Sequence, residues 1–230
     1  MKTMIQRCLL LFLFCGAVPA VGQSALTAHP DASLDGWQDL FTADLSNAIY
    51  QKEVWTVDQG VLTASEDQTI WSARVYDNFV LDLEFKNADG TNSGVIIHGT
   101  DMINWVPNSV EIQIADDYNK KWAESPANWQ CAAVFGHKAA SKQVVKRPGE
   151  WNHMTIKAVD QHISVVLNGE QVIDIDMGEY TSAKDNPDGS AVPEWLTTPL
   201  SALPTYGHIG LQGKHGDATV WFRNLRVKVL

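Results

Sequence analysis

The sequence predicts an all-β protein built as an antiparallel sandwich of two sheets, and three observations support that prediction. Short apolar runs alternate with polar residues at a period of two along much of the chain. A two-residue Asn168-Gly169 turn separates two such runs, which is typical of a β-hairpin. The chain contains no convincing long amphipathic helix and no alternation of strands with helices, which favours a sandwich over an α/β fold.

The predicted strands follow one another at regular spacing. Residues 79–86 alternate between apolar and polar side chains, so we expect a half-buried strand there. The remaining predicted strands are residues 94–97, 110–114, 154–159, 163–167, 171–175, 209–212 and 225–229. We expect the first and last strands to pair, because the two ends of a domain of this size often lie close together.

Two long segments lack this periodicity. Residues 116–141 have no clear period, and residues 178–204 are rich in Asp, Ser, Pro and Gly. Loops of this length in a compact domain tend to be functional or mobile. The first follows directly from the predicted strand at 110–114, so we expect it to wall one end of a cleft. The second is either a lid or a solvated surface excursion.

The amino terminus has the pattern of a secretory leader. Lys2 and Arg7 precede an apolar run at residues 8–18, and Ala20-Val21-Gly22 predicts cleavage before Gln23. The run is too short for a transmembrane helix. We therefore expect a signal peptide at 1–22, a tail at 23–33 and one folded domain at 34–230, in a secreted or periplasmic protein with no membrane contact after leader removal.

Charge and cysteine content narrow the classes of partner. The formal net charge is −10, and it becomes −12 once the leader with its two cations is removed. Nucleic acids and anionic membranes need basic patches, so neither is expected as a partner. Only Cys131 remains in the mature chain, so no internal disulfide can stabilise the fold.

Two titratable residues stand out as candidate catalytic groups. Glu111 interrupts the apolar residues of the strand at 110–114 and must face solvent, a partner or a ligand. His215 follows a strand and lies between two glycines, Gly213 and Gly216, which allow it to project from a tight turn. Its charge changes near neutral pH, as an acid–base catalyst requires. The alternatives are an ordinary exposed carboxylate and a hairpin turn that contains a histidine.

Polar and aromatic residues near these two suit a sugar ligand. Gln113 and Gln212 carry amides able to bind hydroxyl groups. Trp105, Trp122 and Trp129 lie in loops beside Glu111 and are expected to stack on a sugar ring. Four tryptophans within strand motifs are expected to be core residues: Trp37, Trp55, Trp151 and Trp221. A metal site remains open, because His98, Glu111, Asp116, Asp117 and His215 could converge as ligands although they lack a compact ligand spacing.

The chain also resembles a known family. The resemblance runs in order over residues 34–230, through Gly36-Trp37-Gln38-Asp39-Leu40-Phe41, Asn92-Ser93-Gly94-Val95, the stretch 110–117, Pro148-Gly149-Glu150-Trp151-Asn152, Leu167-Asn168-Gly169 and the stretch 212–224. These motifs are similar to those of the 3-keto-disaccharide hydrolase family. The resemblance implies a jelly-roll sandwich like that of concanavalin A-like lectins and glucanases, with the site on its concave sheet.

The resemblance implies a hydrolase or lyase that cleaves the glycosidic bonds of 3-keto-glycosides. Glu111 and His215 would be its catalytic residues. The expected substrate-binding residues are Gln113, His98, Asp116, Asp117, Trp129, Gln212 and Lys214, with His98 standing where many members carry arginine. For such substrates the expected mechanism is elimination followed by hydration, and displacement by two carboxylates, Glu111 with Asp116 or Asp117, is the alternative. A non-catalytic carbohydrate-binding module is the alternative function, since fold does not determine function.

Overall fold

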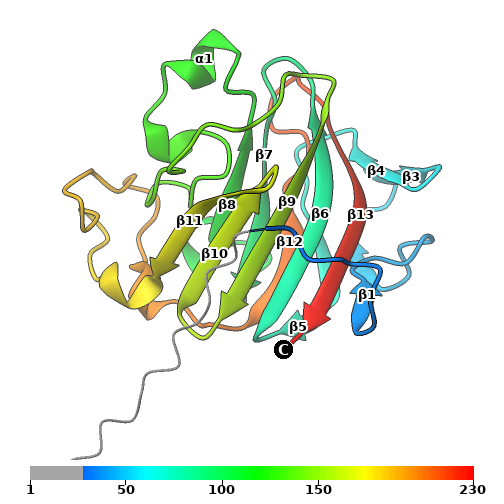
Figure 1. Cartoon of the computed structure of the whole chain (residues 1–230), viewed down its shortest axis with the longest axis horizontal. Helices are drawn as coiled ribbons and strands as arrows, with labels where there is room; N and C mark the ends of the chain where they lie inside the picture. Colours follow the sequence, from blue (N-terminus) through cyan, green and yellow to red (C-terminus); the bar gives the residue numbers. More distant parts are fainter. Residues whose placement is uncertain (1–27) are drawn as a thin grey trace, which may run out of the picture.

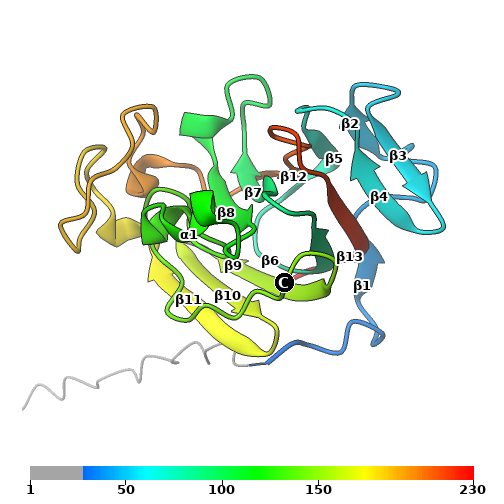
Figure 2. The same ribbon diagram turned by 90° about the horizontal axis from the view of Figure 1, so that it is seen from above.

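The computed structural model describes residues 28–230. The predicted leader and the first part of the predicted tail lie outside the described residues. The described chain forms two antiparallel sheets packed face to face (Figures 1 and 2). The predicted two-sheet sandwich is therefore confirmed. Within residues 28–230, no helix has the length and apolar character needed to cross a membrane.

The larger sheet has eight strands. Seven follow one path in the order β11 (Glu170–Asp176), β10 (His162–Leu167), β9 (Trp151–Val159), β6 (Phe79–Asn87), β13 (Val220–Val229), β4 (Val61–Ala64) and β3 (Trp55–Asp58). β1 (Trp37–Asp39) pairs with the end of β13, which confirms the predicted pairing of the first and last strands.

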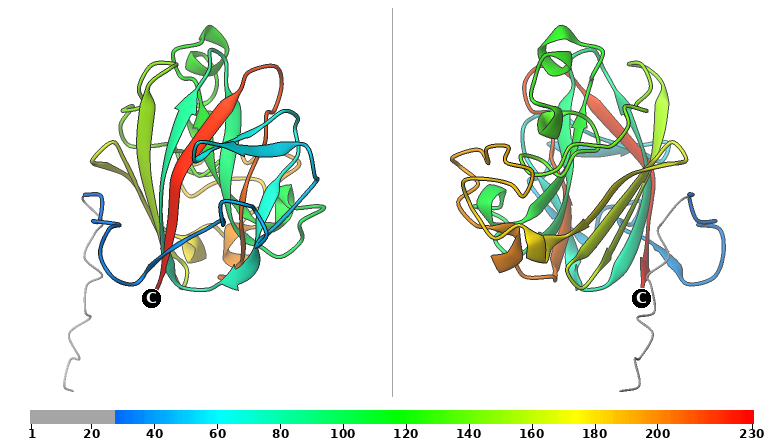
Figure 3. Two further views of the ribbon diagram at one scale, coloured as in Figure 1. Left: turned by 90° about the vertical axis from the view of Figure 1, so that its right-hand side faces the viewer. Right: turned by 60° about the vertical axis from the view of Figure 1, so that its left-hand side comes forward.

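The smaller sheet has five strands, in the order β2 (Ala48–Tyr50), β5 (Ile70–Tyr76), β12 (Gly207–Leu211), β7 (Asn92–Gly99) and β8 (Val110–Ala115). The helices are short: α1 (Lys120–Ala123) and four 3₁₀ turns at Val106–Asn108, Ala127–Trp129, Met177–Glu179 and Leu200–Ala202. Figure 3 shows the long loops on the side of the sandwich away from the eight-stranded sheet.

The turn predicted at Asn168-Gly169 is confirmed, whereas the turn predicted around His215 is correct only in part. Asn168 and Gly169 have φ of 50° and 88°, the positive values that a two-residue hairpin turn requires, and they join β10 to β11. The segment 212–219 is not a hairpin turn. It leaves β12 in one sheet and enters β13 in the other, so His215 lies on a crossover between the two sheets.

The tryptophan prediction was correct for Trp55 alone, which is buried in the core. Trp37, Trp151 and Trp221 are only partly buried. The Lys86 ammonium lies 5.0 Å from the Trp151 ring and 4.7 Å from the Trp221 ring. Cation–π contacts therefore occupy these rings, in place of apolar core neighbours.

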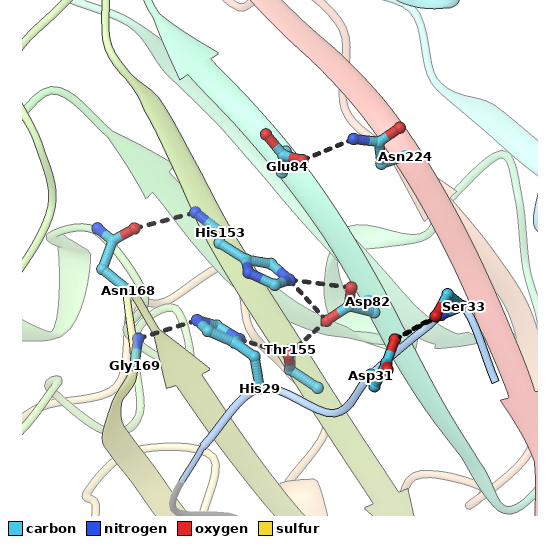
Figure 4. Close-up of polar contacts among 10 residues, drawn as sticks. All are labelled: His29, Asp31, Ser33, Asp82, Glu84, His153, Thr155, Asn168, Gly169 and Asn224. Carbon is cyan, nitrogen blue, oxygen red and sulfur yellow. Dashed lines mark hydrogen bonds and ion pairs between the residues drawn. The ribbon is translucent and has the colours of Figure 1, made fainter.

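β6 also differs from its prediction, because its polar face is largely covered. Asp82 is only 5% exposed although it lies on the face opposite the core. The segment 28–33, which belongs to the predicted tail, covers this part of the sheet (Figure 4). Its His29 ring stacks on His153 with ring centroids 3.6 Å apart. The alternating pattern of β6 gave no sign of this cover, since the covering residues lie about fifty positions away.

A directed chain of hydrogen bonds fixes His29. The Gly169 amide donates to Nε2 of His29 over 2.9 Å, so the neutral ring carries its proton on Nδ1. Nδ1 then donates to Oγ1 of Thr155 over 2.7 Å, and the Thr155 hydroxyl donates to Asp82 over 2.6 Å. Burial, with a smaller contribution from the neighbouring His153, lowers the pKa of His29 to about 4. The docked segment therefore requires neutral His29.

We predict that docking of this segment weakens in acid. The pKa of His29 is lower in the folded protein than its ordinary value of 6.5. The contribution of His29 to the free energy of unfolding is therefore complete above about pH 6.5 and is lost as the pH falls toward 4. Urea unfolding should find His29→Ala less stable than the wild type at pH 7.5, with a smaller difference at pH 5. A difference that does not change with pH would contradict this explanation.

Candidate active site

A cleft of about 940 Å³ lies on the face of the five-stranded sheet that points away from the core. Its polar floor comes from the end of β12, from β7 and β8, and from the crossover segment: Asn92, Glu111, Gln113, Gln212 and His215. Its walls come from three loop segments, 104–107, 121–135 and 195–197. Figure 2 shows these segments around β8.

The main wall is attached to the free edge of β8 by backbone hydrogen bonds. The amides of Gln113 and Phe135 donate to the carbonyls of Ala133 and Glu111, both over 2.9 Å, and the amide of Ala132 donates to Gln113 over 2.8 Å. This pairing satisfies groups that an edge strand would leave exposed. The segment 116–141 therefore walls the cleft, as the sequence analysis predicted.

Glu111 projects into the cleft because its strand is apolar on the other side. Val110, Ile112 and Ile114 are buried in the core, so the alternation of β8 turns Glu111 and Gln113 outward. The Glu111 carboxyl lies over Gly94 of the neighbouring strand. A Cβ added at Gly94 would lie 2.1 Å from Oε1 of Glu111, so only glycine leaves room for this position.

The surroundings of Glu111 favour its neutral form. Burial raises the pKa of its carboxyl to about 8, and the negative charge of Asp67 contributes a smaller rise. The side chain retains some exposure to the cleft. Glu111 is therefore largely protonated at neutral pH, as a proton donor should be.

His215 reaches the same cleft and is paired with Asp67. Nδ1 of His215 lies 2.6 Å from Oδ2 of Asp67. Asp67 belongs to the segment between β4 and β5, and nothing in the sequence pattern pointed to it. Both side chains are about half exposed. The site thus combines a protonated carboxyl group with an imidazole–carboxylate pair.

The remaining floor residues are amides. Gln113 is 2% exposed and donates from Nε2 to Oδ1 of Asn92 over 3.0 Å. Gln212 donates its backbone amide to the carbonyl of Gly94 over 2.9 Å. Gln113 and Gln212 both line the cleft, as expected for residues that bind sugar hydroxyls.

Aromatic side chains line much of the cleft walls. Trp105, Trp122 and Trp129 all line it, although Trp122 is only 5% exposed, and their stacking on a sugar ring stays a prediction. Trp129 also contacts Phe135 and Trp195, with ring centroids 5.4 and 5.7 Å apart. Trp195, 51% exposed, was not singled out from the sequence because it lies in the aperiodic segment 178–204. That segment contributes part of the cleft wall.

Several predicted site residues do not reach the cleft. Asp116 accepts hydrogen bonds from the amides of Gly90 and Tyr118, and Asp117 accepts one from the amide of Cys131. These aspartates hold the wall segment in place, so neither is placed to act with Glu111 as a second carboxylate in the cleft. The Lys214 amide bonds to Glu66, and its side chain does not line the cleft.

His98 lies in the interior instead of the cleft. It is 1% exposed, and its ring is 6.2 Å from that of Phe79 in an edge-on arrangement. Neither ring nitrogen has a hydrogen-bond partner within residues 28–230. Burial lowers the pKa of His98 to about 4, so the ring is neutral. Its expected role in substrate binding has no support in this position.

The residues suggested as joint metal ligands do not come together. Among residues 28–230, the group of His, Cys, Asp and Glu side chains with metal-like proximity is His29, Asp82 and His153, on the opposite sheet (Figure 4). Its histidine rings are stacked at an interplanar angle of 12°, so one ion cannot lie in both ring planes. The ring nitrogens that point inward already make hydrogen bonds.

We predict a carboxyl titration near pH 8 that belongs to Glu111. Carbon-13 spectra of the Glu side chains should show one carboxyl resonance moving around pH 8, because burial opposes ionisation. The resonance should be absent from Glu111→Gln. A Glu111 carboxyl that titrates near 4.5 would contradict the described environment.

Comparisons with known proteins agree with this architecture. A family model described as the 3-keto-alpha-glucoside-1,2-lyase-like domain matches residues 29–228. A 3-keto-disaccharide hydrolase from Bacteroides thetaiotaomicron is 30% identical over 177 residues, which cover 69% of this chain. The match spans 60% of that relative's length.

Two solved structures have a fold similar to that of this chain. A candidate glycosyl hydrolase from Parabacteroides distasonis ATCC 8503 is 53% identical with a TM-score of 0.83, over 84% of this chain and 99% of that one. A Bacillus subtilis protein with a galectin-like fold is 10% identical with a TM-score of 0.52, over 84% and 94% of the two chains, and shows the fold alone. The chain belongs to the 3-keto-alpha-glucoside-1,2-lyase-like family of carbohydrate-active proteins.

Proposed function

We propose that this protein cleaves the glycosidic bond of 3-keto-glucosides by elimination followed by hydration. The observation that carries the proposal is the pairing, in one cleft, of a carboxyl group whose pKa is raised to about 8 with an imidazole. The family description and the name of the B. thetaiotaomicron relative supply the substrate class.

The chemistry depends on the ketone at C3. A carbonyl at C3 acidifies the proton on C2 and places the glycosidic oxygen on C1 in the beta position. A base that takes the C2 proton leaves an enolate. The enolate expels the aglycone and forms a C1=C2 double bond. Addition of water to that double bond then completes a net hydrolysis.

Glu111 is suited to act as the acid that protonates the leaving group. Its carboxyl is largely protonated at neutral pH and can give its proton to the departing glycosidic oxygen. Lys121 also lines the cleft, and its positive charge would stabilise an enolate that forms there. The amides of Gln113 and Gln212 would bind hydroxyl groups of the sugar, and the tryptophans would stack on its rings.

The second candidate is a binding module that does not cleave its ligand. The aromatic wall formed by Trp129 and Trp195 favours it, because stacking aromatic side chains serve binding as well as catalysis. The two candidates differ in what they require of Glu111. A binding module needs only its size and polarity, whereas cleavage needs its proton.

We predict that Glu111→Gln removes cleavage and retains the fold. The exchange keeps the size of the side chain and removes its acidic proton, so turnover of a 3-keto-glucoside should fall on the order of a hundredfold or more. The rate of product release should be measured with 3-keto-glucosides and with their unoxidised parents, in the presence and absence of a chelator. The unoxidised parents should remain intact.

Binding of the 3-keto-glucoside, measured by calorimetry, should survive in Glu111→Gln. Undiminished turnover in the variant would exclude Glu111 as the proton donor. Binding without any turnover in the wild type would favour the binding module.

A further inference from the structure

Asp67 is the one carboxylate that contacts a candidate catalytic side chain in the described structure. It binds Nδ1 of His215 over 2.6 Å across two segments that lie 148 positions apart. Nε2 of the same ring makes no hydrogen bond within residues 28–230, and the ring lines the cleft. A single imidazole therefore has one nitrogen engaged by a carboxylate and the other available to a ligand.

Close backbone contacts hold this pair together. Gly213 lies so near the Asp67 segment that an added Cβ would be 2.4 Å from the carbonyl oxygen of Glu66 and 2.5 Å from that of Gln68. The Lys214 amide donates to Glu66 over 3.1 Å. The buried Trp55 donates from its ring nitrogen to Gln68 over 2.9 Å. The two segments are therefore fixed on both sides of Asp67 and immediately before His215.

We propose that Asp67 is a positioning residue that holds His215 as the base of the reaction. Its carboxylate accepts the Nδ1 proton of neutral His215, which leaves the Nε2 lone pair free in the cleft. The same carboxylate stabilises the imidazolium that forms when Nε2 accepts a proton. This inference rests on the proposed function and assigns the base and the acid within it.

With His215 as the base and Glu111 as the acid, every proton that moves in the elimination is accounted for. Nε2 takes the C2 proton, and the electron pair of the C2–H bond enters the enolate. The enolate electrons then form the C1=C2 bond as the C1–O bond breaks, and the leaving oxygen takes the proton of Glu111. His215 ends protonated and Glu111 ends ionised, so the protein has gained no net proton. Addition of water with proton exchange restores both groups.

The charge of Asp67 acts on the acid as well as on the base. Its negative charge helps to raise the pKa of Glu111. The other charged groups near the pair are Glu66, which precedes Asp67, Lys121, which lines the cleft from α1, and Lys214 and Asp217, which lie beside His215 in the crossover segment. Asp217 is exposed and makes no hydrogen bond or ion pair within residues 28–230. It serves as a matched control.

The test compares Asp67→Ala with Asp217→Ala in the full-length chain. Nitrogen-15 spectra of the neutral His215 ring should show the proton on Nδ1 in the wild type and in Asp217→Ala. In Asp67→Ala, a large fraction should shift to Nε2. With a 3-keto-glucoside, Asp67→Ala should lower kcat about tenfold or more and leave KM nearly unchanged. In Asp67→Ala, the fall in rate caused by ionisation of Glu111 should also begin at a lower pH than in the wild type.

An Asp67→Ala variant that keeps the Nδ1 proton, or that keeps the wild-type kcat, would overturn the role of Asp67. Asp67→Asn provides a second variant in case the alanine exchange lowers folding yield, and its kcat should also fall because the charge is lost. If the wild type turns over no keto-glucoside, the proposed function fails, and the tautomer measurement still decides whether Asp67 positions His215.

Discussion

The apolar residues that β8 buries in the core determine which side chains the strand directs toward the cleft. Val110, Ile112 and Ile114 are almost completely inaccessible to solvent, and the period-two geometry of the strand sends Glu111 and Gln113 to the other face. A slip of one residue would place a carboxyl and an amide in the core, where each unpartnered polar group costs about 1–3 kcal/mol or more. The apolar residues therefore fix the register, and the register places Glu111 in the cleft.

The floor of the site also depends on residues that are small. Gly94 leaves room for the Glu111 carboxyl, and Gly213 allows the crossover segment to approach the backbone beside Asp67. Glu111, His215 and Asp67 come from three places in the chain: β8, the crossover from β12 to β13, and the segment between β4 and β5. Only the packing of the two sheets brings them together. The cover over Asp82 on the opposite sheet is a separate structure with no part in this cleft.

Local patterns in the sequence predicted the parts of the structure that local physics decides. The alternation around Glu111 and the Asn168-Gly169 turn each follow from a few neighbouring residues, and both were predicted correctly. Asp67, Trp195 and the burial of Asp82 were missed, because each depends on partners far away in the chain. The expected roles of Asp116 and Asp117 did not account for backbone amides that bind these carboxylates. His98 has a positive φ and points into the interior, which no alternating pattern reveals.

In the proposed mechanism, the cleft removes a proton from C2 of a keto-sugar before the glycosidic bond breaks. The most direct test is cleavage of a 3-keto-glucoside in deuterium oxide, with the position of deuterium in the keto-sugar product read by NMR immediately after release. Elimination and hydration predict deuterium at C2, because the original proton leaves to His215 and is replaced from solvent. A product that keeps its original hydrogen at C2 would show direct displacement at C1 and would contradict the mechanism.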